Sequence, residues 1–159
     1  WIGLDKKNNN VYALLNHNGI KPQTPKTRGE IILNLLNNEN YNIEFENYSP
    51  FQLFQYTHKT KQIKITLWDG IKPNIILPKK ENTIILTSSS YGVENKRKII
   101  AEKLLEKLNT LNKSNLQEVL SNTSYFPSTI SPKMKGKNSE TISTSIIQIN
   151  NNHNHFNCK

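Results

Sequence analysis

The fold of this chain is decided by the stretch QIKITLWDG, which runs from Gln62 to Gly70. Its first six residues alternate between polar and apolar side chains, which is the period of a β-strand with one buried face. The Asp69-Gly70 pair that ends it is a strong signal for a tight hairpin turn, because both residue types accept the backbone angles that such a turn needs. We therefore expect a strand over Gln62–Trp68 that reverses at once into an antiparallel neighbour.

Six more segments have the composition of strands. Two lie near the start of the chain, where a polar turn joins Trp1–Leu4 to Val11–Asn16. The other four are expected over Phe51–His58, Lys72–Leu77, Thr83–Thr87 and Thr141–Asn150. The run Ile84–Leu86 is apolar without alternation, which indicates a strand that is covered on both faces.

Three segments have helical signals. The segment TRGE (Thr27–Glu30) fits a capping box, in which the Thr hydroxyl accepts from the Glu amide, and it opens a helix over Arg28–Leu36 that two Asn residues end. Apolar residues at helical spacing predict a second helix over Glu94–Leu108. Another capping-box pattern starts at Ser114 and opens a shorter helix through Leu120.

The order of these elements predicts the fold class. Two strands, a helix, a run of antiparallel strands, two helices and a late strand indicate an α+β fold, with helices packed on an antiparallel sheet. The chain has neither regular strand–helix alternation nor a glycine-rich phosphate loop, which argues against a nucleotide-binding α/β fold. Its 159 residues suit one domain over residues 1–159. Residues 123–139 are expected as an irregular loop and residues 151–159 as a low-complexity tail.

The strongly basic composition has two interpretations. The formal charge is +9 and the pI is near 9.6, as in many nucleic-acid-binding proteins. The abundance of Lys, Asn and Ile would also follow from an AT-rich genome, and the chain has only two arginines, the residue favoured for phosphate recognition. No basic run is interleaved with aromatic residues, so we expect no nucleic-acid partner. No stretch approaches the roughly 20 apolar residues of a membrane span, so we expect none.

The redox and metal-binding residues are few. Cys158 is the single cysteine, so no intrachain disulfide can form, which fits a reducing compartment and a cytoplasmic protein. His153 and His155 would share one face of a strand, but no clear third ligand accompanies them and metal sites need three or four. We therefore expect no metal and no cofactor.

Candidate functional side chains stand at three places. Asn16 ends a strand, where its amide can either polarise a carbonyl oxygen or satisfy a turn. Arg28 lies in the first turn of a helix, where the helix dipole disfavours a cation, so a carboxylate or an anionic ligand is expected beside it. Ser88 and Ser89 join a strand to a helix without the glycines of a nucleophile elbow, so they either cap that helix or donate hydrogen bonds into a cleft.

Several short segments together resemble one protein family in their order and spacing. These segments are Trp1–Leu4, Ala13–Asn16, Thr27–Glu30, Tyr48–Leu53, Leu67–Gly70, Ser88–Ser90 and Thr141–Ile146. They are similar to the motifs of the NRDE family, also called the transport and Golgi organisation family, and they are closest to those of its bacterial members. The resemblance covers the chain to about Leu108 and returns at Thr141.

The resemblance implies a fold and a chemistry. The fold would be the αββα sandwich of the N-terminal-nucleophile hydrolases, in which two antiparallel sheets lie between helical layers. The presumed nucleophile of the family is a Cys after the initiator Met, and Cys158 cannot replace it because the free α-amino group of the nucleophile serves as the base. The chain opens at Trp1 inside an expected hairpin, so we expect a member that lacks its N-terminal segment and is inactive by itself.

Two functions follow from the resemblance. The intact protein would be a C–N (amide) hydrolase or an acyl transferase, by analogy of fold. Asn16 would then help to polarise the carbonyl, Arg28 would orient an anionic substrate or brace its motif, and Ser88 and Ser89 would line the cleft. The alternative is a non-catalytic carrier of a hydrophobic anionic metabolite such as haem or acyl-CoA. The small-molecule substrate or ligand and the oligomeric state are left open.

Overall fold

The computed structural model describes residues 1–78, 84–87, 94–108, 112–121, 145–149 and 154–158. The chain divides into two compact units, Trp1–Gly92 and Val93–Lys159, and each is described by itself. The single NRDE-like domain expected over residues 1–159 stays a prediction, and the expected loop of residues 123–139 lies outside the described residues. Among the residues that are described, no helix has the length and apolar character needed to cross a membrane.

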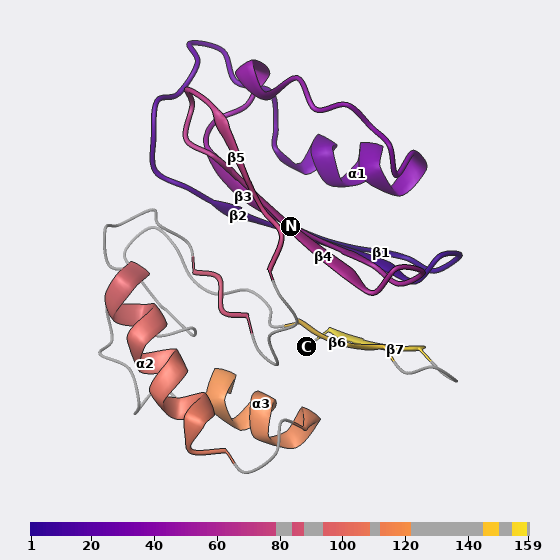
Figure 1. Ribbon diagram of the computed structural model, residues 1–159, viewed down its shortest axis with the longest axis vertical. Coiled ribbons are helices and arrows are strands. Elements are labelled where there is room, and N and C mark those ends of the chain that lie inside the picture. The colour runs from indigo at the N-terminus through magenta and orange to yellow at the C-terminus, as the bar shows by residue number, and fades with distance from the viewer. Residues whose placement is uncertain (79–83, 88–93, 109–111, 122–144, 150–153, 159) are drawn as a thin grey trace. The chain divides into compact units, whose positions relative to one another are not determined.

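The first unit contains a five-stranded antiparallel sheet in the order β1-β2-β3-β4-β5, which follows the order of the chain (Figure 1). Its strands are β1 (Ile2–Asp5), β2 (Asn10–Asn16), β3 (Phe51–Thr57), β4 (Gln62–Trp68) and β5 (Pro73–Ile76). The strands expected near the start of the chain and over the three central ranges are confirmed, and each end agrees within one residue. The α+β architecture built on an antiparallel sheet is therefore confirmed as well.

The Asp69-Gly70 turn is confirmed, since Trp68 at the end of β4 pairs with Pro73 at the start of β5. The carboxylate of Asp69 accepts hydrogen bonds from the backbone N–H groups of Lys72 (3.0 Å) and Ile71 (2.8 Å). These two donors favour the charged form and lower the pKa of Asp69. The side chain thus holds the turn that joins β4 to β5.

A helix and a short 3₁₀ turn follow β2. Helix α1 spans Gly29–Asn37 and ends at Asn38, as expected, while the 3₁₀ turn η1 spans Phe45–Asn47. The predicted capping box is wrong: the amide of Glu30 donates to the backbone oxygen of Thr27 (3.1 Å), and no side chain caps the helix. The reason is positional, because Arg28 is itself the N-cap residue and Thr27 stands one position too early.

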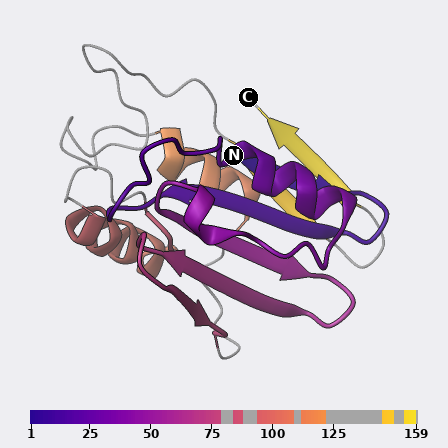
Figure 2. The same cartoon turned by 90° about the horizontal axis from the view of Figure 1, so that it is seen from above.

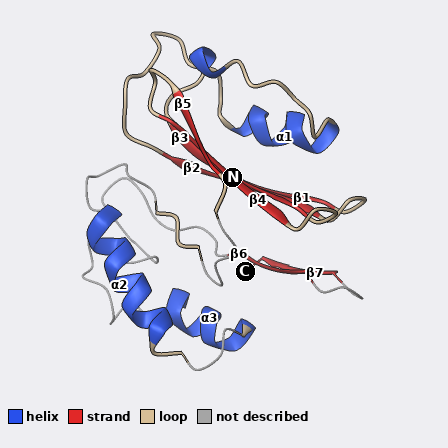
Figure 3. Cartoon of the chain, viewed as in Figure 1, coloured by secondary structure: helices blue, strands red, loops and turns tan. Residues whose placement is uncertain are grey.

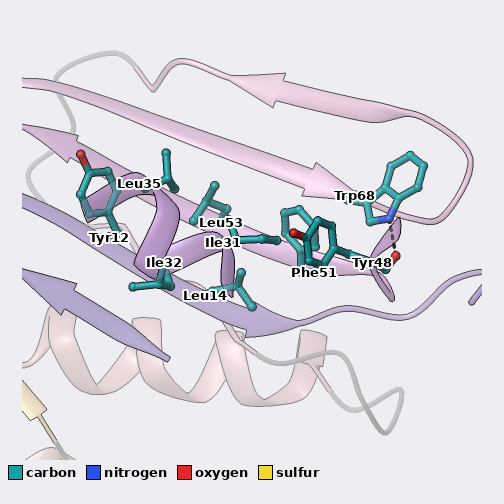
Figure 4. Close-up of a cluster of buried hydrophobic side chains, with 9 residues drawn as sticks. All are labelled: Tyr12, Leu14, Ile31, Ile32, Leu35, Tyr48, Phe51, Leu53 and Trp68. Carbon is teal, nitrogen blue, oxygen red and sulfur yellow. Dashed lines mark hydrogen bonds between the residues drawn. The ribbon is translucent and has the colours of Figure 1, made fainter. Parts of the chain in front are cut away.

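The apolar face of α1 packs on the sheet and forms the core of the first unit. Ile31 and Leu35 of the helix are buried against Leu14 of β2 and Phe51 and Leu53 of β3. The close-up in Figure 4 shows these side chains converging between the helix and the strands, with Tyr48 and Trp68 at one end of the cluster. Burial of each such side chain contributes about 1.5–3 kcal/mol, so this contact is the main source of stability in the unit.

Glycine 3 sets how close the helix comes to the sheet. A Cβ atom at this position of β1 would lie 2.6 Å from Cγ2 of Ile32 and 3.1 Å from Cδ1 of Leu36. Both neighbours belong to α1, and Ile32 is buried. The absence of a side chain at Gly3 therefore allows the helix to lie directly on the edge of the sheet.

One buried hydrogen bond links two ends of the core. The indole N–H of Trp68 donates to the backbone oxygen of Tyr48 over 2.9 Å, and the two residues are 5% and 1% exposed (Figure 4). Burial raises the pKa of the Tyr48 hydroxyl, and its hydrogen bond with Tyr41 raises it further. The bond fixes the chain just before β3 to the last residue of β4.

The opposite face of the sheet is apolar as well. The strand register places Leu4, Val11, Phe54 and Ile65 on the side that faces away from α1. The alternation in Gln62–Trp68 predicted one buried face, but Thr66 and Trp68 on the α1 side are also buried. A sheet that is apolar on both sides needs a covering layer on each.

The strand expected over Thr83–Thr87 is wrong for the four residues that are described, Ile84–Thr87, which form no strand. The contact that holds this segment is a side-chain hydrogen bond, from Nε2 of Gln52 to the backbone oxygen of Thr87 (2.8 Å). A short apolar run indicates burial, but it does not specify a hydrogen-bonding partner for the backbone. Thr83 lies outside the described residues.

The described residues of the second unit form two helices and a hairpin, shown in blue and red in Figure 3. They are α2 (Glu94–Glu106), α3 (Lys113–Ser121), β6 (Ser145–Ile149) and β7 (Asn154–Cys158), with β6 and β7 antiparallel. The expected helices are confirmed. The side chain that caps α3 is that of Asn112, which accepts from the amide of Asn115 (2.9 Å). The capping box predicted at Ser114 is therefore placed two residues too late.

The expected late strand over Thr141–Asn150 is confirmed for Ser145–Ile149, whereas its first four residues and Asn150 lie outside the described part. The low-complexity segment of residues 151–159 contains β7, which pairs with β6 from Ser145 opposite Cys158 to Ile149 opposite Asn154. A biased composition therefore did not prevent strand formation here.

Replacement of Trp68 by Phe is expected to lower the free energy of unfolding by about 1–3 kcal/mol, because it removes the donor to the buried Tyr48 oxygen. Leu33→Ala is the control, since Leu33 of α1 is 61% exposed and its truncation should change stability by less than about 0.5 kcal/mol. Urea unfolding followed by circular dichroism measures both. Equal losses in the two variants would show that the buried bond is unimportant.

Candidate functional site

The first candidate site lies where β2 ends and β3 begins. Asn16, the last residue of β2, pairs with Phe51, the first residue of β3. The carbonyl oxygen of Pro50, one residue earlier, accepts from the backbone N–H of His17 (3.2 Å) and from Nη1 of Arg28 (2.8 Å). The fold thus brings Asn16 and Arg28, two of the predicted site residues, to the same end of the sheet.

Arg28 is engaged by the protein itself. Besides its bond to Pro50, its guanidinium carbon lies 5.7 Å from the centre of the Trp1 ring, within the range of a cation–π contact. Burial lowers the pKa of this guanidinium. The contacts are to a carbonyl and an aromatic face, rather than to the carboxylate that the helix dipole argument allowed. Arg28 therefore braces the start of α1.

The packing of Trp1 also explains the glycine in the TRGE segment. A Cβ atom at Gly29 would lie 2.8 Å from Nε1 of Trp1, which is closer than side chains pack. Gly29 makes room for the indole while Arg28 lies over its ring. Two of the four residues in this motif are thus explained by the packing of Trp1.

Asn16 is exposed at the end of its strand. Within the described residues its side chain makes no hydrogen bond, so the turn-stabilising role that the sequence allowed is not observed there. On the other face of the sheet, Gln52 donates to Thr87 and lies 3.5 Å from Nδ1 of His17. Ser88 and Ser89, which follow Thr87 in the chain, lie outside the described residues.

A second candidate site, which the sequence did not predict, is a pocket of about 380 Å³ on the α1 side of the sheet. It lies between the segment that follows α1 and the strands β3, β4 and β5. Its apolar wall consists of Leu35, Ile43, Phe45 and Ile75. Figure 2 shows why space is available there: α1 lies above β1 and β2, and among the described residues of the first unit no α-helix lies above β4 and β5 on this face.

The polar groups of this pocket come mainly from the sheet. Gln55 of β3 is paired directly with Lys64 of β4, and Thr66 follows Lys64 by two residues on the same face. Glu39 faces them from the segment after α1 and accepts from Nδ2 of Asn10 (3.2 Å). Sequence reasoning assigned Lys64 and Thr66 to a solvated face, because polar residues that alternate with apolar ones usually are solvated.

Metal binding finds no support in the described part of the chain, where no three side chains of His, Cys, Asp or Glu are grouped. His153 lies outside the described residues. His155 belongs to β7, of which only the backbone is described. The expectation that these histidines hold no metal stays a prediction.

Comparison of the chain with protein-family models, with curated proteins and with solved structures found no match. The resemblance to the NRDE family therefore stays a prediction, as do the αββα sandwich and the hydrolase chemistry that it implies. The α+β class and the antiparallel sheet rest on the coordinates alone.

If Arg28 is a brace, Arg28→Met should lower the free energy of unfolding by about 1–3 kcal/mol, because it removes a charge-assisted hydrogen bond and a cation–π contact. Arg28→Lys should recover only part of the loss, since an ammonium group cannot stack as a planar guanidinium does.

Lys26→Met provides the matched control for this measurement. Among the described residues, the ammonium group of Lys26 forms one contact, an exposed ion pair with Glu44 at 3.6 Å, which is worth well under about 1 kcal/mol. Urea denaturation of the three variants gives the comparison. An Arg28→Met protein as stable as Lys26→Met would rule out the bracing role.

Proposed function

We propose that this chain forms the sheet and helices of an NRDE-family protein with an N-terminal-nucleophile hydrolase-like fold. The observation that carries the proposal is the five-stranded antiparallel sheet with apolar side chains on both faces. Helix α1 covers one face, and a sandwich of two sheets would cover the other. The order of the short segments that resemble the family's motifs supports the same assignment.

The reaction we propose is C–N (amide) hydrolysis or acyl transfer. An N-terminal Cys, encoded upstream of the Trp1 codon, would attack the amide carbon with its thiolate and form a thioester as the C–N bond breaks. Its α-amino group would take the thiol proton and pass it to the leaving amine. Water would then hydrolyse the thioester, or an acceptor amine would take the acyl group.

The strand end described above would contribute binding groups to this reaction. The exposed and unbonded amide of Asn16 can donate to an oxyanion. Arg28, which is held by Pro50 and Trp1, would position the backbone near that site and would not contact the substrate. Ser88 and Ser89 are proposed to line the cleft on the strength of the resemblance alone.

A second candidate function is non-catalytic binding of a hydrophobic anionic metabolite. Lys64 and the apolar wall of the pocket favour it, whereas Glu39 in the same lining opposes a ligand that is only anionic. Its volume of about 380 Å³ is near the lower end of the range for small-molecule sites. Haem or an acyl-CoA would therefore be held only in part by this pocket.

One experiment separates the two candidates. The reading frame upstream of Trp1 is cloned, and hydrolysis of amide and thioester substrates is measured for the full protein and for its N-terminal Cys→Ala variant. The variant and the 159-residue chain should both fall to background, which amounts to a loss of at least about 10³-fold for removal of a nucleophile. Cys158→Ala is the matched control and should keep full activity.

Other outcomes count against hydrolysis. Activity that survives the N-terminal Cys→Ala change, or an upstream frame without Met-Cys, would refute the proposed mechanism. Binding of haem or an acyl-CoA by the full protein without any turnover would establish the second candidate in its place.

A further inference from the structure

The pocket at Lys64 contains a buried hydroxyl group that no described residue satisfies. Thr66 is 2% exposed and lines the pocket. Its hydroxyl has no hydrogen-bond partner among the residues that the structure describes. An unsatisfied buried polar group costs about 1–3 kcal/mol, so native proteins rarely keep one without a function or a bound molecule.

Two opposite charges line the same pocket without pairing with each other. Lys64 and Glu39 both border the cavity, yet no ion pair joins them or ties either one to another described residue. Gln55, directly opposite Lys64 across the β3–β4 pair, adds an amide whose donors and acceptor are also unused among the described residues. The charges are thus free to bind complementary groups of a ligand that lies between them.

The remaining wall is apolar and rigid. The ring of Phe45 stacks on Phe51, with centroids 6.0 Å apart, and is tilted against Trp68 at 5.5 Å. These contacts hold Phe45 on the core side, while it borders the pocket together with Ile43 and Ile75. The wall offers an aromatic and aliphatic surface for the body of a small molecule.

We propose that this pocket binds a small zwitterion with an apolar body, of the size and kind of an apolar amino acid. Its carboxylate accepts hydrogen bonds from Lys64, Gln55 and Thr66, and its ammonium group donates to Glu39. Its side chain lies against Phe45. A lone anion would be repelled by Glu39 and a lone cation by Lys64, so the pair of charges selects a molecule that carries both.

This inference does not rest on the proposed hydrolase activity. Gln55 is four residues along β3 from Phe51, where the Asn16 site lies, which corresponds to about 13 Å of strand. The pocket is also on the face covered by α1 and not on the second apolar face. A failure of either proposal would therefore leave the other standing.

The experiment is an NMR titration of the 159-residue chain with three probes that share a phenyl group. L-Phenylalanine carries both charges, 3-phenylpropionate lacks the ammonium group, and phenethylamine lacks the carboxylate. Saturable shifts should map to the amides of residues 39–45 and of β3–β5. L-Phenylalanine should bind at least about 10-fold more tightly than either analogue, as expected for one charged hydrogen-bonded contact.

The variants assign each charge to its partner. Lys64→Met should weaken the binding of L-phenylalanine and 3-phenylpropionate about 10-fold. It should strengthen the binding of phenethylamine, because the repulsion between the two ammonium groups is lost. Glu39→Gln, which keeps an oxygen for Asn10, should weaken only the two amines. Thr66→Val is nearly isosteric and should weaken only the two carboxylates. Lys72→Met, which removes an exposed lysine outside the pocket, is the control and should change nothing.

Several results would overturn the proposal. They are equal affinities for the three probes, shifts that map outside the pocket, and affinities that Lys64→Met leaves unchanged. Absence of saturable binding of L-phenylalanine at about 10 mM, a Kd weaker than any specific small-molecule site needs, would overturn it as well. Lys64 and Glu39 are outside the buried core, so their variants should keep the dispersed spectrum of the folded chain.

Discussion

The packing of α1 on the edge of the sheet is the constraint on which the rest of the first unit depends. A helix with its side chains is about 10 Å wide, whereas five strands at about 4.8 Å spacing span about 19 Å between the outer two. Gly3 has no side chain and so allows α1 to lie directly on β1. The helix therefore covers β1 and β2 and is too narrow to cover β4 and β5 as well. The segment after the helix has to cover that side, and the pocket is the space that it leaves.

The aromatic residues around η1 cover the part of the sheet that α1 leaves open. Phe45 lies over Phe51 and Trp68, and the Trp68–Tyr48 hydrogen bond fixes the return of the chain into β3. Asn10 shows how the unit treats buried polar groups elsewhere: it is 2% exposed, donates to Glu39 and accepts from the backbone N–H of His58. Thr66 is an exception, because its hydroxyl has no hydrogen-bond partner in the part of the chain that the structure describes.

The local elements could be predicted because they depend on local periodicity and turn chemistry. The alternation in Gln62–Trp68 gave β4, and Asp69-Gly70 gave the turn into β5. The capping box at Thr27 failed, since Arg28 takes the N-cap position through its contacts with Pro50 and Trp1, which are distant in sequence. The strand predicted over Ile84–Leu86 was wrong for the same reason. A strand needs a neighbouring strand for its backbone hydrogen bonds, and the apolar character of a segment does not identify that neighbour.

In the candidate sites, too, the residue types could be predicted from the sequence, whereas the contacts between distant segments could not. Asn16 and Arg28 could be singled out by residue type, but the shared attachment point at Pro50 is visible only in three dimensions. The pocket escaped prediction because its floor has the ordinary polar alternation of a strand. The polar residues of the strand line a pocket because the segment after α1 passes over them. That segment has no periodic pattern of apolar residues, so its path could not be predicted from the sequence.

Strand β3 connects the two candidate sites through the core. Phe51, Leu53 and Gln55 lie on one face of it, so the residue beside Asn16, the centre of the core and the floor of the pocket follow each other at two-residue steps. Phe51 and Leu53 are fully buried, and a close-packed core allows little independent movement of such side chains. The strand therefore holds both sets of polar groups in place before any ligand arrives, which is the condition under which few hydrogen bonds can give useful affinity.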